Sequence, residues 1–193
     1  MTGWFASCWR RCRLAGVVLM CAVLAACALP TPDGDGPAGA YTRVGRFALN
    51  VTSPGTARQA VQGGFVWRDN GRSLRLDLAN PLGTILARVD ADDDHAVLTR
   101  SDGTQTTADN ADALVADVLG SAMPVTGLRD WLHGRQASGQ VTDLQRDSEG
   151  RLEHFVEDGW QVRMSRYDEQ GPRLLRMARQ QAGKSIDVRL VID

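Results

Sequence analysis

The sequence predicts a mainly β fold with a helical insert, in which an open antiparallel half-barrel sheet carries short helices over its concave hydrophobic face. Three features of the 193-residue chain predict this class. From Tyr41 onward most segments alternate apolar and polar residues, and short turns rich in Gly, Asn and Asp separate them. The alternation changes to helical spacing between about Asp109 and Gly134.

The N-terminal segment has the order of an export signal. The basic residues of RRCR (10–13) precede the apolar run Leu14 to Ala26. An uncleaved membrane anchor is the alternative, but the run is shorter than the roughly 20 apolar residues that a bilayer span needs. We therefore expect residues 1–26 to be a signal peptide.

The junction Leu24-Ala25-Ala26-Cys27 resembles the lipobox of bacterial lipoproteins, in which the leader is cut before a cysteine that then carries acyl chains. Cys8, Cys12 and Cys21 all lie in the leader, so Cys27 is the one cysteine left after cleavage, and no disulfide or Cys-based metal pair remains. The alternative is a chance buried cysteine. The resemblance implies lipidation at Cys27, with these acyl groups in place of any cofactor. Since Ala28 follows where Asp would favour the inner membrane, it also implies an outer-membrane anchor facing the periplasm.

Residues 27–40 join the lipidated cysteine to the body. Ala28 to Ala40 is rich in Pro, Gly and Asp and predicts a flexible tether that reaches roughly 20 Å. Residues 41–193 then form a single domain. After residue 26 the chain holds 19 basic and 23 acidic residues, a net charge of −4, which argues against a general nucleic-acid binder.

The first strands follow from period-two alternation. Phe47, Leu49 and Val51 share one face of a strand. The second strand has Val61, Gly63, Phe65 and Trp67 on one face, and the third has Leu74, Leu76 and Leu78. Short turns such as Asp69-Asn70-Gly71 and Asp158-Gly159 join neighbouring strands into hairpins. The C-terminal third returns to strands, with Trp160, Val162 and Met164 in one and Ile186, Val188, Leu190 and Ile192 in the last.

Two short helices interrupt the strands. In the first, Leu114, Val115, Val118 and Leu119 follow helical spacing, with Asp109 as the N-cap and Gly120 as the stop. The second carries Leu128, Trp131 and Leu132, with Thr126 as its cap and Gly134 as its end. A sheet this long curls, and the helices lie across its concave face. Periodicity leaves open whether side chains fill the enclosed volume or a ligand cavity remains, and whether Trp67, Trp131 and Trp160 pack in the core or line a pocket.

No catalytic or metal motif emerges. The Asp90, Asp92, Asp93 and Asp94 group lacks the glycine and the bidentate Glu of a calcium loop, so a solvated hairpin tip explains it. There is no G-x-S-x-G, HExxH or CxxC motif. We expect a protein that is not an enzyme and that holds no metal.

The segment Asn80-Pro81-Leu82-Gly83 predicts a turn, with Asn, Pro and Gly at turn-forming positions and Leu82 projecting from the tip. An exposed leucine needs no function. The lipid tether, however, confines this tip to the neighbourhood of a bilayer.

Taken in order, these segments resemble the LolB family of outer-membrane lipoproteins, which receive other lipoproteins from a soluble periplasmic carrier and insert them into the outer membrane. The resemblance covers roughly Val44 to Asp193. It rests on G-R-F-A-L from Gly45, G-x-F-x-W ending at Trp67, the N-P-L-G segment ending at Gly83, T-A-D-x-A-D-A-L from Thr107, P-V-x-G-L-R-x-W-L-x-G from Pro124 and D-G-W from Asp158.

The resemblance implies a LolA/LolB-like half-barrel whose hydrophobic cavity is closed by helices. Leu82, presented by Asn80, Pro81 and Gly83, would be the protruding residue that acts in membrane insertion. We expect the cavity to be lined by Phe47, Leu49, Phe65, Trp67, Leu76, Leu78, Leu128, Trp131, Leu132 and Trp160. One departure is the Pro/Gly-rich stretch before Tyr41, where the family usually has a helix.

The implied partners are a LolA-like periplasmic carrier, acylated lipoprotein cargo and the inner leaflet of the outer membrane, and we expect a monomer. Two other functions remain as alternatives. One is a structural scaffold lipoprotein of the outer membrane with a solid core, and the other is a lipid-processing hydrolase.

Overall fold

The computed structural model describes residues 41–119 and 124–193. The expected signal peptide, Cys27, the tether and the Gly120 helix stop lie outside the described residues. So do the boundaries at residues 26 and 40, which stay predictions.

Within the described residues, eleven strands form one antiparallel sheet. The strands are β1 (Tyr41–Thr52), β2 (Gln59–Asp69), β3 (Leu74–Ala79), β4 (Ile85–Ala91), β5 (Ala96–Arg100), β6 (Gln105–Ala108), β7 (Val141–Arg146), β8 (Leu152–Glu157), β9 (Trp160–Asp168), β10 (Gly171–Gln181) and β11 (Lys184–Ile192). The helices α2 (Ala111–Leu119) and α3 (Val125–Leu132) separate β6 from β7. The predicted mainly β class with a helical insert is confirmed.

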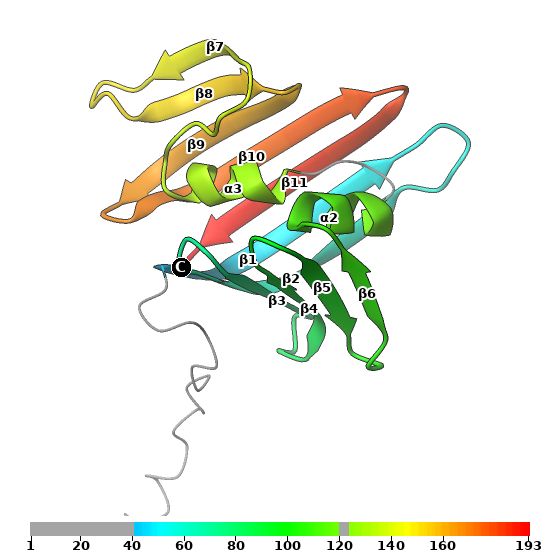
Figure 1. Cartoon of the computed structure of the whole chain (residues 1–193). Coiled ribbons are helices and arrows are strands. Elements are labelled where there is room, and N and C mark those ends of the chain that lie inside the picture. Colours follow the sequence, from blue (N-terminus) through cyan, green and yellow to red (C-terminus); the bar gives the residue numbers. More distant parts are fainter. Residues whose placement is uncertain (1–40, 120–123) are drawn as a thin grey trace, which may run out of the picture. The chain divides into compact units, whose positions relative to one another are not determined.

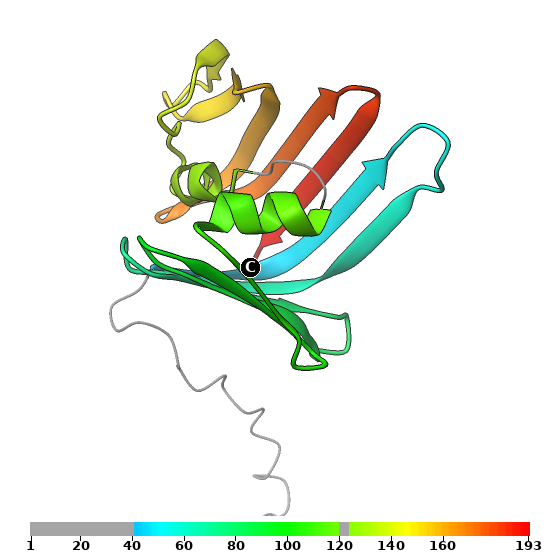
Figure 2. The same cartoon turned by 45° about the vertical axis from the view of Figure 1, so that its right-hand side comes forward.

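The strand order is β6-β5-β4-β3-β2-β1-β11-β10-β9-β8-β7. The sheet is open because β6 and β7 are its edges, while the first and last strands pair at its centre from Gly45↔Ile192 to Thr52↔Ser185. The chain therefore crosses from one edge to the other through α2 and α3. These helices lie in front of the concave face of the curved sheet (Figures 1 and 2).

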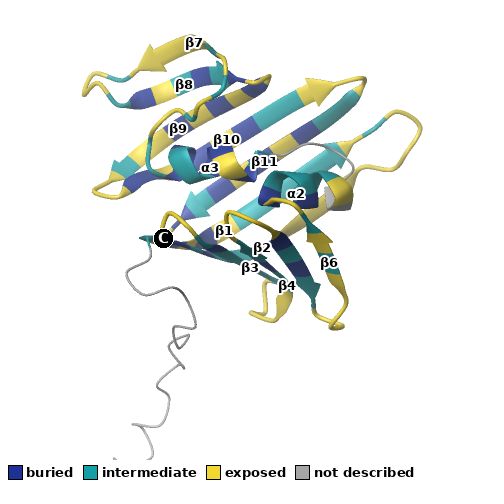
Figure 3. Ribbon diagram, viewed as in Figure 1, coloured by how far each residue is buried: buried dark blue, intermediate teal, exposed yellow. Residues whose placement is uncertain are grey.

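Alternating burial explains why these segments are strands. In β9 the side chains of Trp160, Val162 and Met164 are buried, and the residues between them are exposed. Buried and exposed bands alternate along this strand in Figure 3. The buried residues face the helices across the concave side, so the core lies between the sheet and the helix pair.

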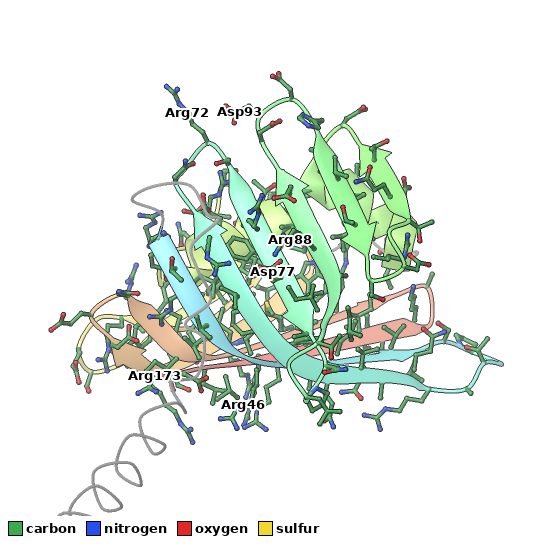
Figure 4. The ribbon with its side chains drawn as sticks, turned by 90° about the horizontal axis from the view of Figure 1, so that it is seen from below. Arg46, Arg72, Asp77, Arg88, Asp93 and Arg173 are labelled. Carbon is green, nitrogen blue, oxygen red and sulfur yellow. The ribbon has the colours of Figure 1, made fainter. Side chains whose placement is uncertain are left out.

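Charged side chains gather on the outer face. Asp77 of β3 is buried between Arg88 Nε at 2.5 Å and Arg68 Nη1 at 3.3 Å. Figure 4 shows Asp77 and Arg88 together on the outer side of the strands, and Arg46 and Arg173 pointing away from the sheet.

At the β4–β5 turn the Asp92 carboxylate accepts the N–H groups of Asp94 and His95, each at 3.0 Å, and so closes its own hairpin.

Both predicted helix caps were wrong. Asn110, not Asp109, caps α2, because its Oδ1 accepts the Ala113 N–H at 2.8 Å. Pro124 stands at the N-cap of α3 and offers no side-chain bond. The Thr126 N–H instead donates to the Asp112 carboxylate of α2 at 2.9 Å, so the first helix caps the second. The predicted end of α3 at Gly134 is confirmed, since this residue has a φ of +72° and its N–H bonds the Trp131 carbonyl.

None of the helices in the described part of the chain has both the length and the apolar character needed to cross a membrane.

Candidate functional site

An apolar cavity of about 310 Å³ lies between the concave face of the sheet and the two helices. The sheet side comes from β1 to β5 and β11, and the helices cover the other side. Its lining residues are Phe47, Leu49, Phe65, Trp67, Leu76, Leu78, Leu86, Ala87, Val89, Leu98, Arg100, Leu114, Val115, Val125, Leu128, Leu132, Val188 and Leu190. All are apolar except Arg100, so the site suits a hydrocarbon chain.

Eight of the expected cavity residues line this space, namely Phe47, Leu49, Phe65, Trp67, Leu76, Leu78, Leu128 and Leu132. Strand alternation put them on one face, and the curl of the sheet turns that face inward. Phe47, Leu49, Leu76 and Leu78 keep part of their surface exposed, although they pack against the core. The sequence pattern did not decide between a filled core and a ligand cavity, and the structure contains a cavity.

Trp131 and Trp160 do not line the cavity, contrary to expectation. Both are 1% exposed and belong to the packed core. Trp131 donates its Nε1–H to the buried carboxylate of Glu157 at 2.8 Å. Its ring packs edge-on against Phe155, with the ring centroids 6.1 Å apart. Glu157 is 2% exposed and needs donors, which Trp131 and the N–H groups of Ala137 and Gly139 supply. This requirement holds the indole on the β8 side, away from the hollow.

Sequence reasoning missed several lining residues, on β11 of the sheet and on α2. The alternation of Val188 and Leu190 and the helical spacing of Leu114 and Val115 marked them as apolar, but gave no sign that they border a cavity. Arg100 carried no signal at all, because a charged residue near a hairpin turn is ordinary.

The end of α3 is fixed to the sheet by polar contacts. The Tyr41 hydroxyl donates to the Leu132 carbonyl at 2.7 Å, and its ring stacks on His133 with centroids 3.8 Å apart. Burial raises the pKa of Tyr41 to about 12, so the phenol keeps its proton and remains a donor. Arg129 of α3 makes a second set of contacts, since its Nε lies 2.5 Å from the buried carboxylate of Asp69 and its Nη1 donates to the Gly71 carbonyl.

The β3–β4 turn presents Leu82 with 92% of its surface exposed. Asn80 organises the turn, since its Oδ1 accepts the N–H groups of Leu82 at 2.9 Å and Thr84 at 3.0 Å, while its carbonyl accepts the Gly83 N–H. Gly83 has a φ of +88°, a conformation that glycine adopts without strain. Pro81 is exposed beside the tip. The leucine is thus held outward by a rigid turn.

A family model described as outer membrane lipoprotein LolB matches residues 39–193. The chain belongs to the LolB family. An outer-membrane lipoprotein LolB of Bordetella pertussis is 53% identical over 176 residues, which cover 90% of this chain and 88% of the relative. The LolB of Bordetella petrii is 51% identical with the same coverage of each chain. The LolB of Cupriavidus necator is 40% identical over 178 residues, covering 89% and 90%.

Membership confirms the resemblance and the outer-membrane localisation expected from the sequence. It favours a receptor in lipoprotein localisation over the structural scaffold. Among solved structures, a LolA superfamily protein from Nitrosomonas europaea matches with a TM-score of 0.39 and 11% identity, over 79% of this chain and 86% of that one.

Proposed function

We propose that this LolB-family protein accepts the acyl chains of lipoproteins from a LolA-like periplasmic carrier into the cavity beneath α2 and α3, and passes them to the outer membrane. The observation that supports this proposal is the cavity itself, whose lining is apolar apart from Arg100. A solid core, as expected for a scaffold, would leave no such space.

The physical chemistry of transfer favours direct contact between two cavities. Each methylene exposed to water costs about 0.8 kcal/mol, so acyl chains leave a carrier only into another apolar site. Transfer without nucleotide hydrolysis then runs downhill, with the carrier holding the chains less tightly than this protein, and this protein less tightly than the bilayer. An apolar cavity that is partly open to solvent suits an affinity for acyl chains between that of the carrier and that of the bilayer.

The proposal gives Cys27 and Leu82 separate roles. Acyl groups on Cys27 would keep the domain at the inner leaflet, because several chains anchor durably where one does not. Leu82 would enter the headgroup boundary and hold the cavity near the membrane. The rigid turn around Asn80 supports this role, since a leucine with 92% exposure already has its apolar surface in water.

The test mixes a soluble version of the chain, residues 28–193, with a carrier loaded with acylated cargo and asks by co-purification which protein holds the cargo. We expect the cargo to move onto the chain. If circular dichroism shows a folded chain and the cargo stays on the carrier, the proposal fails and the scaffold is the better function. Ester hydrolysis that is lost on replacing one serine would instead identify a hydrolase.

A further inference from the structure

Arg100 is the charged residue among those that line the apolar cavity. Its strand, β5, places Leu98 and Arg100 on the concave side, and both residues border the hollow. Ala87 of β4 pairs with Arg100 and lines the cavity as well. Among the described lining residues, a guanidinium therefore lies beside side chains that are otherwise apolar.

The guanidinium has one polar partner in the described part of the chain. Its Nη1 donates to the Thr106 hydroxyl of β6 at 3.0 Å, and it forms no ion pair with a described carboxylate. The carboxylate of Asp102 is near enough for Arg100 to help lower its pKa, although hydrogen bonds from Thr104 are the larger cause. Thr104 donates hydrogen bonds from both its hydroxyl and its N–H to the Asp102 carboxylate. Arg100 thus retains donors for an incoming group.

Arg100 lies at the rim and not at the bottom of the cavity. It is the last residue of β5 and is half-buried, and the neighbouring lining residue Leu86 is 39% exposed. Ser101 donates its N–H to the Leu86 carbonyl at 3.0 Å, which ties this hairpin to the start of β4. The turn from Asn80 to Gly83 precedes β4 at the same end of the sheet. The cation therefore borders the opening on the side of the Leu82 turn.

We propose that the cavity takes single-chain lipids with an anionic head group, the chain lying against the apolar walls and the head group paired with Arg100. An apolar cavity with one cation at its rim matches an amphiphile with one charge at its end. A guanidinium binds carboxylate and phosphate oxygens through charge-assisted, often bidentate hydrogen bonds. At about 310 Å³ the cavity is at the small end of ligand sites, and a lipid with a single chain suits that volume.

This inference rests on the proposed function, because it needs a cavity that admits acyl chains. It adds a requirement that the proposed function lacks, namely a preference for a negative head group. The head group has two sources, a fatty-acid carboxylate or the phosphate of a lysophospholipid. Both present anionic oxygens at the end of one chain.

The test uses the full chain in vesicles of zwitterionic phosphatidylcholine at pH 8. Photoreactive hexadecanoic acid, its methyl ester and a photoreactive lysophosphatidylglycerol are supplied separately, and mass spectrometry measures labelling of the cavity peptides. The variants are Arg100→Gln and Arg100→Lys, with Arg46→Gln as the matched control on the outer face, where Arg46 is 74% exposed. Circular dichroism checks that each variant is folded.

In Arg100→Gln we expect labelling by the acid to fall about tenfold, the effect of losing one charge-assisted hydrogen bond. Labelling by the methyl ester should be unchanged, Arg100→Lys should retain most of the labelling by the acid, and Arg46→Gln should match the parent. A parallel fall with lysophosphatidylglycerol assigns phosphate as well as carboxylate to the site, and a fall with the acid alone assigns carboxylate only.

Equal labelling by the acid in the parent chain and in Arg100→Gln, with the ester also bound, would overturn the role of Arg100 and leave the proposed function intact. Failure of every probe to label the cavity of the folded parent chain would overturn both.

Discussion

Leu82 is exposed because its turn is built from side-chain and backbone bonds at Asn80, so its replacement should not disturb the sheet. In Leu82→Glu we expect cargo uptake from the carrier to be unchanged and delivery to vesicles to fall at least about tenfold, since a carboxylate in the headgroup boundary opposes insertion. Release of labelled cargo into vesicles measures this.

Leu144→Glu is the matched control, because Leu144 is an exposed leucine, at 43%, on the edge strand β7. Equal delivery by the parent and by Leu82→Glu would remove Leu82 from the mechanism. Equal loss in both variants would point to a general effect of added negative charge.

The glycine pair in β2 shows how closely its neighbours approach. A Cβ on Gly63 would lie 1.9 Å from the Ala79 carbonyl oxygen, whereas one on Gly64 would meet nothing nearer than 3.7 Å. Gly63→Ala should therefore lower the free energy of unfolding by about 1–3 kcal/mol through overpacking. Gly64→Ala should change it by about 0.5 kcal/mol or less. Urea denaturation of both variants checks this, and equal losses would contradict the close approach.

The site residues that were predicted correctly are those whose role follows from their neighbours in the sequence. The turn that exposes Leu82 and the inward direction of Phe65 and Trp67 could both be predicted without knowing which distant segments pack nearby. Trp131 was assigned to the cavity wrongly, because the buried Glu157 that binds it lies 26 residues away in the sequence. Arg100 was missed since its importance comes from the apolar walls around it.

At the scale of elements, α3 depends on an ion pair with the β2–β3 hairpin. Asp69 is 4% exposed, and its Oδ2 accepts no directed hydrogen bond from the described residues, so Arg129 stabilises it by charge. Arg129→Gln leaves a buried carboxylate unpaired and should cost about 3 kcal/mol of unfolding free energy.

The double variant Asp69→Asn with Arg129→Gln removes both charges and should recover most of that loss. Denaturation of the parent, both single variants and the double variant gives the coupling energy. Additive losses would show that the pair does not hold α3.

The C-terminal end of α3 should make stability depend on pH. Burial lowers the pKa of His133 below its ordinary 6.5, and the charge of Arg135 adds to this. The unfolded chain thus takes up the proton first as the pH falls. The stability associated with neutral His133 is complete above pH 6.5 and is lost as the pH falls through the lower pKa of the folded state.

Thermal unfolding of the parent and of His133→Gln between pH 7.5 and 5 measures this contribution. We expect the parent to lose more stability than the variant over that interval. Parallel curves would mean that the stacked imidazole titrates alike in both states.

At the scale of the molecule, the predicted half-barrel was correct because each hairpin is local and each strand alternates. Sequence patterns did not predict that β1 and β11 pair at the centre, since their partners are separated by almost the whole domain. This pairing makes β6 and β7 the edges, and it forces α2 and α3 to cross the concave face between them.

The cavity is the space that this crossing leaves, so filling it should abolish uptake without unfolding the protein. Ala87 of β4 faces the hollow, and in Ala87→Phe the ring has room in a cavity of about 310 Å³. We expect the free energy of unfolding to be unchanged or higher, because added apolar contacts replace empty space. Cargo uptake should fall at least about tenfold, since the ring occupies the volume that acyl chains need.

Ala48→Phe on the outer side of β1 is the matched control, because it adds the same ring without entering the apolar cavity. Co-purification with loaded carrier measures uptake, and urea denaturation measures stability. Full uptake by a stable Ala87→Phe chain would mean that acyl chains bind elsewhere, or that the helices move far enough to make room for both. Loss of uptake in Ala87→Phe alone would identify the space under the helices as the acyl-binding site.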